Sequence, residues 1–193
     1  MEIAIIISSL LLILFAVLAL YDGFYLHILK YQLFNQTESK TEHIIHTIRA
    51  VLFPAILYFL FLKQDSNASF LIGITIVLLD IIVLAVDAFV EKDSRHFMGG
   101  LPRWEYIVHL FVNGFHFASI AVYLSIKLTI ENREIMIRSI THSSASELFN
   151  TLIVNLLPGA IIIAILHILL CIPKTTNVWN NLTNKISCCR LSS

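Results

Sequence analysis

The chain has 193 residues, of which 58% are hydrophobic and 13% are charged. A soluble domain carries about 45–50% apolar and about 25% charged residues, so a globule this small could not bury so much apolar surface. Thirteen basic residues balance thirteen acidic ones, which leaves no overall field to attract nucleic acid. With a mean hydropathy of +0.83, the composition predicts a polytopic membrane protein and excludes most soluble enzymes.

Five apolar runs each approach the ~20 residues needed to cross a bilayer core. They predict an all-α bundle of five transmembrane helices in one domain, 1–193. The first run lacks a basic leader and exceeds the h-region of a signal peptide, so we expect it to remain as a helix. The polar segment 127–149, with spaced Ile and Met, is expected along the membrane surface. The predicted spans are about 3–26, 44–62, 70–90, 105–126 and 150–172.

The distribution of basic residues predicts how the bundle is oriented. With the N-terminus outside, the inner segments hold eight Lys and Arg residues and the outer segments hold four. This favours an N-out, C-in topology. We expect a multi-pass integral membrane protein, in a bacterial inner membrane, whose surroundings are the lipid bilayer.

Ionisable residues form one stripe on the third span and another on the fourth. An ionised group at the bilayer centre costs at least ~2.5–3.5 kcal/mol, so such residues indicate function. The three residues of each stripe are separated by seven and four positions on the third span, and by four and seven positions on the fourth. These separations keep each set on one helical face. The stripes are Asp80, Asp87 and Glu91 on the third span, and Glu105, His109 and His116 on the fourth.

The two stripes match in depth if the spans form an antiparallel hairpin centred on position 98. Each matched pair of residue numbers sums to 196, and chance seldom gives three matched levels. The expected pairs, from the membrane centre towards the cytoplasmic rim, are Asp80 with His116, Asp87 with His109, and Glu91 with Glu105.

Each of the five spans also supplies one histidine or aspartate at a common depth, roughly 9–12 Å from its centre on the cytoplasmic side. Three imidazoles and two carboxylates make a mixed nitrogen and oxygen set that suits zinc, iron or manganese. We therefore predict a transition-metal site, zinc or iron, with one or two ions. The predicted ligands are Asp22, His46, Asp87, His109 and His167.

Other polar residues are expected around this metal site in supporting positions. Two carboxylates, Glu91 and Glu105, are the candidate catalytic groups. Two arginines of the turn region, Arg95 and Arg103, are expected at headgroup level, where they could bind a phosphate or carboxylate. Residues expected to orient the ligands or bridge a second ion are Glu42, Asp80, His116, His27 and Arg49.

Several of these residues have a purely structural alternative. Ser39 and Glu42 have the spacing of a capping box, so Glu42 could simply cap the second helix. Glu105 lies in the first turn of its helix, where an acidic residue suits the helix dipole. His43 is expected to face the headgroups, and Arg49 to pair with Asp22 or Asp87.

Three functions fit the pattern. The first is a metal-dependent enzyme that acts on a lipid-like or other apolar substrate, by metal-activated water hydrolysis or di-iron oxidation. The second is a transporter that handles protons or a divalent cation along the stripe. The third is a b-type cytochrome with histidines as axial ligands, which leaves the carboxylates unexplained. The metal-dependent enzyme accounts for both residue types.

Overall fold

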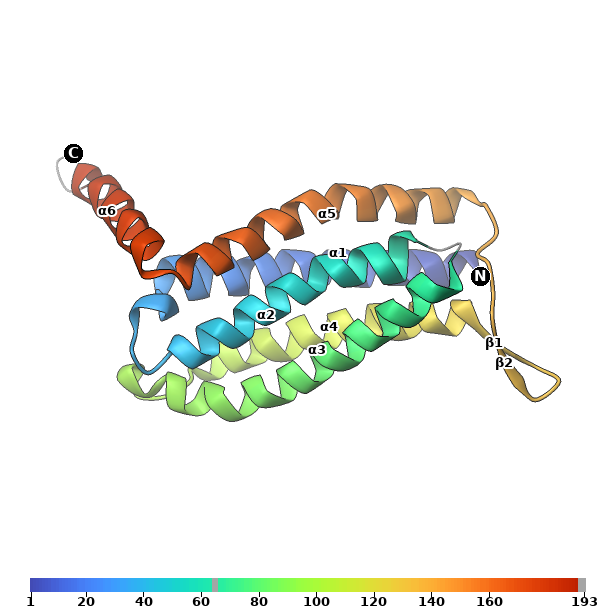
Figure 1. Ribbon diagram of the computed structural model, residues 1–193, viewed down its shortest axis with the longest axis horizontal. Coiled ribbons are helices and arrows are strands. Elements are labelled where there is room, and N and C mark those ends of the chain that lie inside the picture. Colours follow the sequence, from blue (N-terminus) through green and yellow to red (C-terminus); the bar gives the residue numbers. More distant parts are fainter. Residues whose placement is uncertain (64–65, 191–193) are drawn as a thin grey trace.

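The computed structural model describes residues 1–63 and 66–190 as a bundle of long helices (Figure 1). Five helical stretches have the length and composition to cross a membrane, which confirms the five predicted spans and the all-α class. They are α1 (Glu2–Ala19) with its π-helical continuation η1 (Leu20–Lys30), α2 (Lys40–Ile56) with the π-helical η3 (Leu57–Leu62), α3 (Asn67–Ser94), α4 (Arg103–Lys127) and α5 (Ser144–Leu170).

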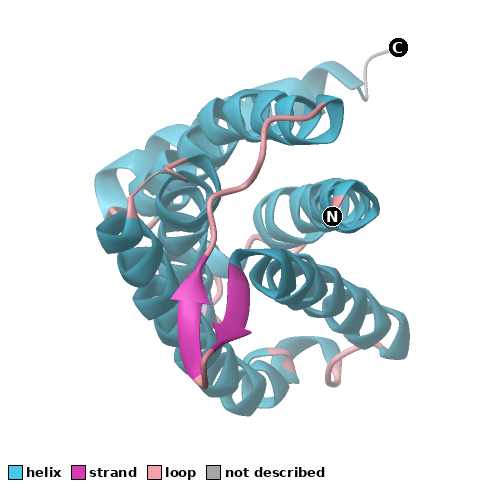
Figure 2. Cartoon of the chain, turned by 90° about the vertical axis from the view of Figure 1, so that its right-hand side faces the viewer, coloured by secondary structure: helices cyan, strands magenta, loops and turns pink. Residues whose placement is uncertain are grey.

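The neighbour order of the helices differs from their order in the chain. Closely packed backbones follow the order α4, α1, α5, α2, α3 among the described residues, and α3 and α4 approach each other much less closely. Viewed along the bundle, the helices surround a common interior (Figure 2). The hairpin partners α3 and α4 must therefore be bridged by side chains.

The segment 127–149 does not form a single surface element. Lys127 ends α4, two antiparallel strands follow, β1 (Leu128–Glu131) and β2 (Glu134–Ile137), and α5 already begins at Ser144. The earlier start of α5 has a local cause, because Ser143 caps the helix by accepting a hydrogen bond from the backbone N–H of Ser146.

The chain ends in a further helix, α6 (Pro173–Arg190), which projects from the bundle at the end opposite the N-terminus (Figure 1). Trp179 of α6 packs against Ile28 and Leu170. Asn180 and Asn35 exchange two amide hydrogen bonds of 2.9 and 3.0 Å. These contacts attach α6 to the connection between α1 and α2, which is formed in part by the 3₁₀ turn Leu33–Asn35.

Apolar packing fills the half of the bundle nearest the N-terminus. The ring of Tyr123 on α4 lies 4.8 Å from that of Phe61 on η3 and 5.6 Å from that of Phe149 on α5. Aromatic contacts of this kind favour a tightly packed interior. Apart from Lys127 at the end of α4, the buried charged residues lie towards the opposite half, which holds the α1–α2 and α3–α4 connections.

One glycine fixes how closely α3 approaches the second span. A Cβ atom at Gly73 would lie 2.8 Å from the Cα of Leu60, whereas a Cβ at Gly114 of α4 would meet open space. We therefore expect Gly73→Ala to lower the free energy of unfolding by about 1–3 kcal/mol through overpacking. Gly114→Ala should cause no loss, because nothing surrounds it. Thermal unfolding in detergent would compare the two, and equal stabilities would contradict this packing.

Candidate metal centre

A cluster of buried charged and imidazole side chains occupies the half of the bundle that holds the α3–α4 turn. Six carboxylates, each at most 14% exposed at the side chain, lie there with six histidines and two arginines. We call this set the polar cluster. Its members are Asp22, Glu42, Asp80, Asp87, Glu91, Glu105, His27, His43, His46, His109, His116, His167, Arg49 and Arg95.

The π-helical segment η1 brings Asp22 and His27 to the same side of the first span. Five residues in a regular α-helix turn by 500°, so these side chains would diverge by about 140°. In a π-helix residues i and i+5 lie one above the other, and the Oδ1 atom of Asp22 lies 3.5 Å from Nε2 of His27. His27 is completely buried and lies centrally in the polar cluster, rather than at the rim where the α-helical period places it.

His109 lies between two carboxylates from different helices. Its Nε2 atom is 3.0 Å from Oδ1 of Asp22, and its Nδ1 atom contacts Glu91. Both ring nitrogens therefore face carboxylate oxygens. The expected pairing with Asp87 is wrong, because α3 packs on α2 and Asp87 faces that helix, while the longer Glu91 side chain reaches His109.

His46 on α2 lies between two other carboxylates. Its Nε2 atom is 3.5 Å from Oδ2 of Asp87 and 3.6 Å from Oε1 of Glu42. The ring of His46 also stands edge-on to the ring of His27, with the centroids 4.2 Å apart. Helices α1, α2 and α3 thus meet at this histidine.

The ligand atoms of the polar cluster form two groups with the composition of a metal site, and the groups share His27. One group is Asp22, His27 and His109, and the other is His27, Glu42 and His46, with the ligand atoms of each within 4.8 Å of one another. Zinc binds nitrogen and oxygen at about 2.0–2.2 Å, so two ligands of one ion lie at most about 4.4 Å apart. Because zinc ligands are arranged tetrahedrally, they lie about 3.3–3.6 Å apart, so the side chains of each group would move together by up to about 1 Å to bind an ion.

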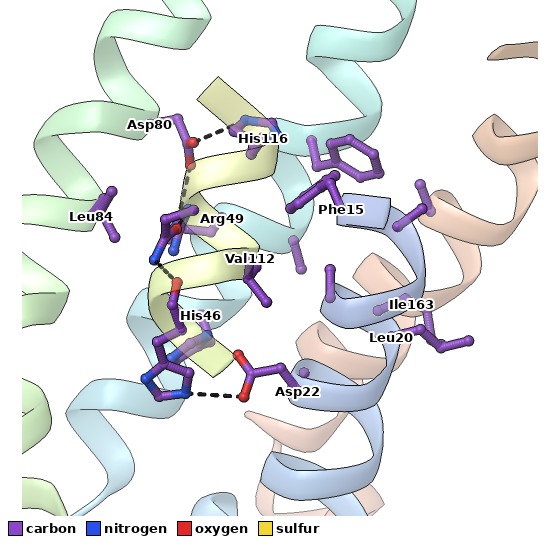
Figure 3. Close-up of a pocket in the computed structure, with 18 of the residues that line it drawn as sticks. Phe15, Leu20, Asp22, His46, Arg49, Asp80, Leu84, Val112, His116 and Ile163 are labelled. Carbon is purple, nitrogen blue, oxygen red and sulfur yellow. Dashed lines mark hydrogen bonds and ion pairs between the residues drawn. The ribbon is translucent and has the colours of Figure 1, made fainter. Parts of the chain in front are cut away.

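Asp80, near the middle of the bundle, contacts a histidine and an arginine from two other helices. Its carboxylate lies 3.4 Å from Nε2 of His116, which confirms the expected pair, and 3.1 Å from Nε of Arg49 (Figure 3). Arg49 also donates to Asn113 at 2.8 Å, and its ion pair with Asp87 at 3.9 Å confirms one of its two expected partners. Arg49 thus links α2 to α3 and α4.

Arg95 lies at the α3–α4 turn and binds two carboxylates in the protein interior. Its Nη1 atom donates to Glu42 at 2.6 Å and its Nη2 atom donates to Glu105 at 2.7 Å. Burial alone would lower the pKa of Arg95, but these carboxylates raise it above the usual value. The guanidinium also lies 3.3 Å from Nε2 of His27.

The structure corrects the roles expected for three residues at this turn. Arg95 is 0% exposed, so it cannot bind a headgroup, while Arg103 is exposed. The expected Glu91–Glu105 pair at the rim is wrong, because Glu105 binds Arg95 instead.

Glu42 does not form a capping box with Ser39 at the start of α2. The hydroxyl of Ser39 instead donates to the Ser94 carbonyl at 2.7 Å.

His167 on α5 lies apart from the two candidate ligand groups. It is 2% exposed and stacks on the ring of His43, with centroids 5.4 Å apart and planes 19° apart. His43 is itself 3% exposed, so it does not face the headgroups. The stacked pair forms one edge of the polar cluster between α2 and α5.

A cavity of about 560 Å³ lies beside the polar cluster. Asp22, His46, Asp80 and His109 line one wall, and Arg49 bridges this wall towards the bundle centre (Figure 3). The opposite wall is apolar. It is formed by Phe15, Ala16, Ala19, Leu20, Leu156, Ala160, Ile162 and Ile163 of α1, η1 and α5.

Formal charges in the polar cluster do not cancel. Six buried carboxylates face only two buried arginines among the described residues of this half, which leaves four negative charges. Ionised carboxylates are not tolerated in an apolar interior without compensation. Protons on the histidines and carboxylates, or two divalent cations, would supply it.

Comparison with protein-family models, with curated proteins and with solved structures finds no match to this chain.

The Arg95 network predicts a sharp contrast between the two arginines of the turn region. Arg95→Gln leaves Glu42 and Glu105 buried without their cation, so we expect a loss of about 3–5 kcal/mol in unfolding free energy. Arg103→Gln, at an exposed position, should change stability by less than about 0.5 kcal/mol. Unfolding of both variants in the same detergent gives the comparison. Equal losses of unfolding free energy in the two variants would show that Arg95 does not stabilise the α3–α4 turn.

Proposed function

We propose that this protein is a membrane-embedded, metal-dependent enzyme that acts on a lipid-like substrate. The observation that carries the proposal is the pair of ligand groups sharing His27, within a cluster that holds four more carboxylates than arginines. Metal ions bound there would satisfy the charges and the unpaired ligand atoms together. The five long apolar helices support membrane embedding of this centre.

Unpaired atoms in the polar cluster support ligation rather than a closed hydrogen-bond network. Buried atoms without a hydrogen-bond partner include the carboxylate oxygens Oε1 of Glu42 and Oδ1 of Asp87. A buried polar atom left unpaired costs about 1–3 kcal/mol, so each favours an added cation or proton. Ligation through Nε2 of His27 requires only that its hydrogen bond from Arg95 breaks, because Arg95 retains both carboxylates.

The ligand types support zinc or iron, and two ions would occupy both ligand groups. Imidazole and carboxylate ligands suit both metals. Asp22 and His109 serve the first ion, Glu42 and His46 serve the second, and His27 lies between them. Asp87, 3.5 Å from His46, is the further oxygen donor for the second ion, while His167 supports the site from outside both groups.

Of the two expected catalytic carboxylates, Glu91 fits a role at the substrate. It lines the cavity and contacts Nδ1 of His109, so it would hold that ring in place when Nε2 binds a metal and would accept a proton from a substrate in the cavity. Glu105 is completely buried against Arg95 and holds the turn instead. A bound metal would supply either activated water for hydrolysis or, as a di-iron centre, oxidation of the substrate.

Apolar rings at the inner end of the polar cluster favour an enzyme over a transporter. His116 packs against Phe15, Phe53 and Phe117, with ring centroids 4.4, 5.9 and 4.9 Å away. Beyond these rings the described core is largely apolar, with the Ser8–Ser119 hydroxyl pair at 3.2 Å. The cluster therefore ends in a blind cavity. We place its open end on the cytoplasmic side, in a bacterial inner membrane.

A b-type cytochrome is disfavoured by the surroundings of the same histidines. Both ring nitrogens of His109 face carboxylates, and Nε2 of His46 faces two more. Axial haem ligation needs a nitrogen directed at the iron. Carboxylates in those positions are suited instead to holding cations.

Metal content tests the proposal directly. Protein purified without chelators should contain about one or two equivalents of zinc or iron. His27→Ala should remove most of this metal, because both ligand groups lose a member. His142→Ala is the matched control, since His142 is exposed in the segment before α5, and it should leave the content unchanged. Elemental analysis of the three proteins gives the result.

Metal-free wild-type protein would overturn the proposal. Equal metal content in His27→Ala and wild type would place the ion elsewhere. Circular dichroism of each sample keeps the comparison between folded proteins.

A further inference from the structure

The apolar wall of the cavity has no role in holding the metal. Its residues come from α1, η1 and α5, opposite the polar cluster, with Phe15 and Ile163 directed into the space (Figure 3). The wall continues along α5 from His167 past Ala160 to Asn155. At 1.5 Å per residue, the twelve positions from 167 to 155 span roughly 18 Å. The cavity is therefore elongated, with polar side chains along one wall from His109 to Asp80 and apolar side chains along the other.

Several residues that line the cavity are also exposed on the outside of the bundle. Leu20 is 53% exposed and Ile162 is 65% exposed. Both lie where η1 and α5 face the surroundings that the long apolar helices require. The cavity thus reaches the outside of the bundle, facing the acyl region of a bilayer, beside Leu20 and Ile162 and beside Leu110 of α4, which also lines it and is 60% exposed.

Gly159 leaves this side of the cavity unobstructed. It lines the cavity, and a Cβ atom built there would meet nothing within 4 Å. The preceding residue, Pro158, lacks a backbone N–H, which interrupts the helical hydrogen bonding of α5 at this point. Gly159 thus leaves room in the cavity beside α5.

Size and charge limit what the cavity holds. A volume of about 560 Å³ lies within the range of about 300–1,000 Å³ typical of a site for one small molecule. Two divalent ions would cancel the excess of carboxylates over arginines, so no net charge at the cluster favours an ionic group, and a neutral polar head fits beside it. The long apolar wall suits one straight hydrocarbon chain.

We propose that the cavity binds a single-chain amphiphile with a neutral polar head, such as a long-chain alcohol. The head lies at the polar cluster, and the chain runs along α1 and α5 past Gly159, which sets the room available to it. This inference rests on the proposed function, whose substrate class it specifies. The bilayer itself is the source of the ligand.

Two glycines provide a matched pair for the test. Gly159 lines the cavity, whereas Gly114 is in the middle of α4 on its exposed side and is not part of the cavity lining. Both have open space at the Cβ position. Tryptophan at either position adds the same side chain to an exposed helix, but only Gly159→Trp obstructs the proposed passage.

The experiment uses hexadecanol with a mid-chain diazirine, irradiated with the holoprotein in phosphatidylcholine vesicles. Peptide mapping should find the label on the cavity wall of α1 and α5. Gly159→Trp should reduce labelling there about tenfold, equivalent to about 1.4 kcal/mol, while Gly114→Trp should retain it. If either tryptophan variant unfolds, Gly159→Leu and Gly114→Leu replace the pair.

Metal content measured on the same samples separates the two proposals. The proposed site for the hydrocarbon chain is overturned if both variants are labelled equally, or if the label is found only on outward-facing residues. Normal metal content in the same samples would then leave the enzyme proposal standing. Wild-type protein that takes the label at the cavity wall but contains no metal sustains the chain site and overturns the metal proposal.

Discussion

Six carboxylates buried with two arginines are the constraint on which this half of the bundle depends. Each ionised carboxylate needs a cation or a proton within hydrogen-bonding distance, because an apolar interior does not solvate its charge. Arg95 satisfies Glu42 and Glu105, and Arg49 satisfies Asp80. These pairs join α2, α4 and α3 at two levels. The remaining carboxylates, Asp22, Asp87 and Glu91, lie against histidines.

The wide spacing of α3 and α4 follows from these side-chain bridges. Carboxylate and imidazole groups between the two helices keep the backbones apart, whereas the small residue Gly73 lets α3 approach η3 closely. The same spacing leaves room for the cavity in the interior. Charge, helix separation and cavity volume are thus consequences of one set of residues.

Regular helical periodicity predicted the part of the site that lies on regular helices. The five spans and the Asp80–His116 contact followed from length, composition and spacing alone. Asp80 and His116 are in uninterrupted stretches of α3 and α4, where 100° per residue holds. Their depths could therefore be counted from the turn.

The other features of the site could not be predicted, because they depart from regular α-helical periodicity. The π-helical turn of η1 rotates His27 into the centre, and no α-helical projection shows this. Arg95 follows the last residue of α3, so its inward direction depends on the turn rather than on a helix face. Glu91 replaces Asp87 beside His109 because α3 packs on α2. The stacking of His43 on His167 depends on α5 being the neighbour of α2, which spacing cannot reveal.

The most direct test of the central claim, that metal ions compensate the buried carboxylates, is anomalous X-ray diffraction from crystals of chelator-free protein. Data collected on both sides of the zinc and iron absorption edges would locate each ion. The account predicts an anomalous peak between Asp22, His27 and His109, and at full occupancy a second between His27, Glu42 and His46. An ordered polar cluster with no anomalous peak at either edge would contradict it and leave protons as the compensating charges.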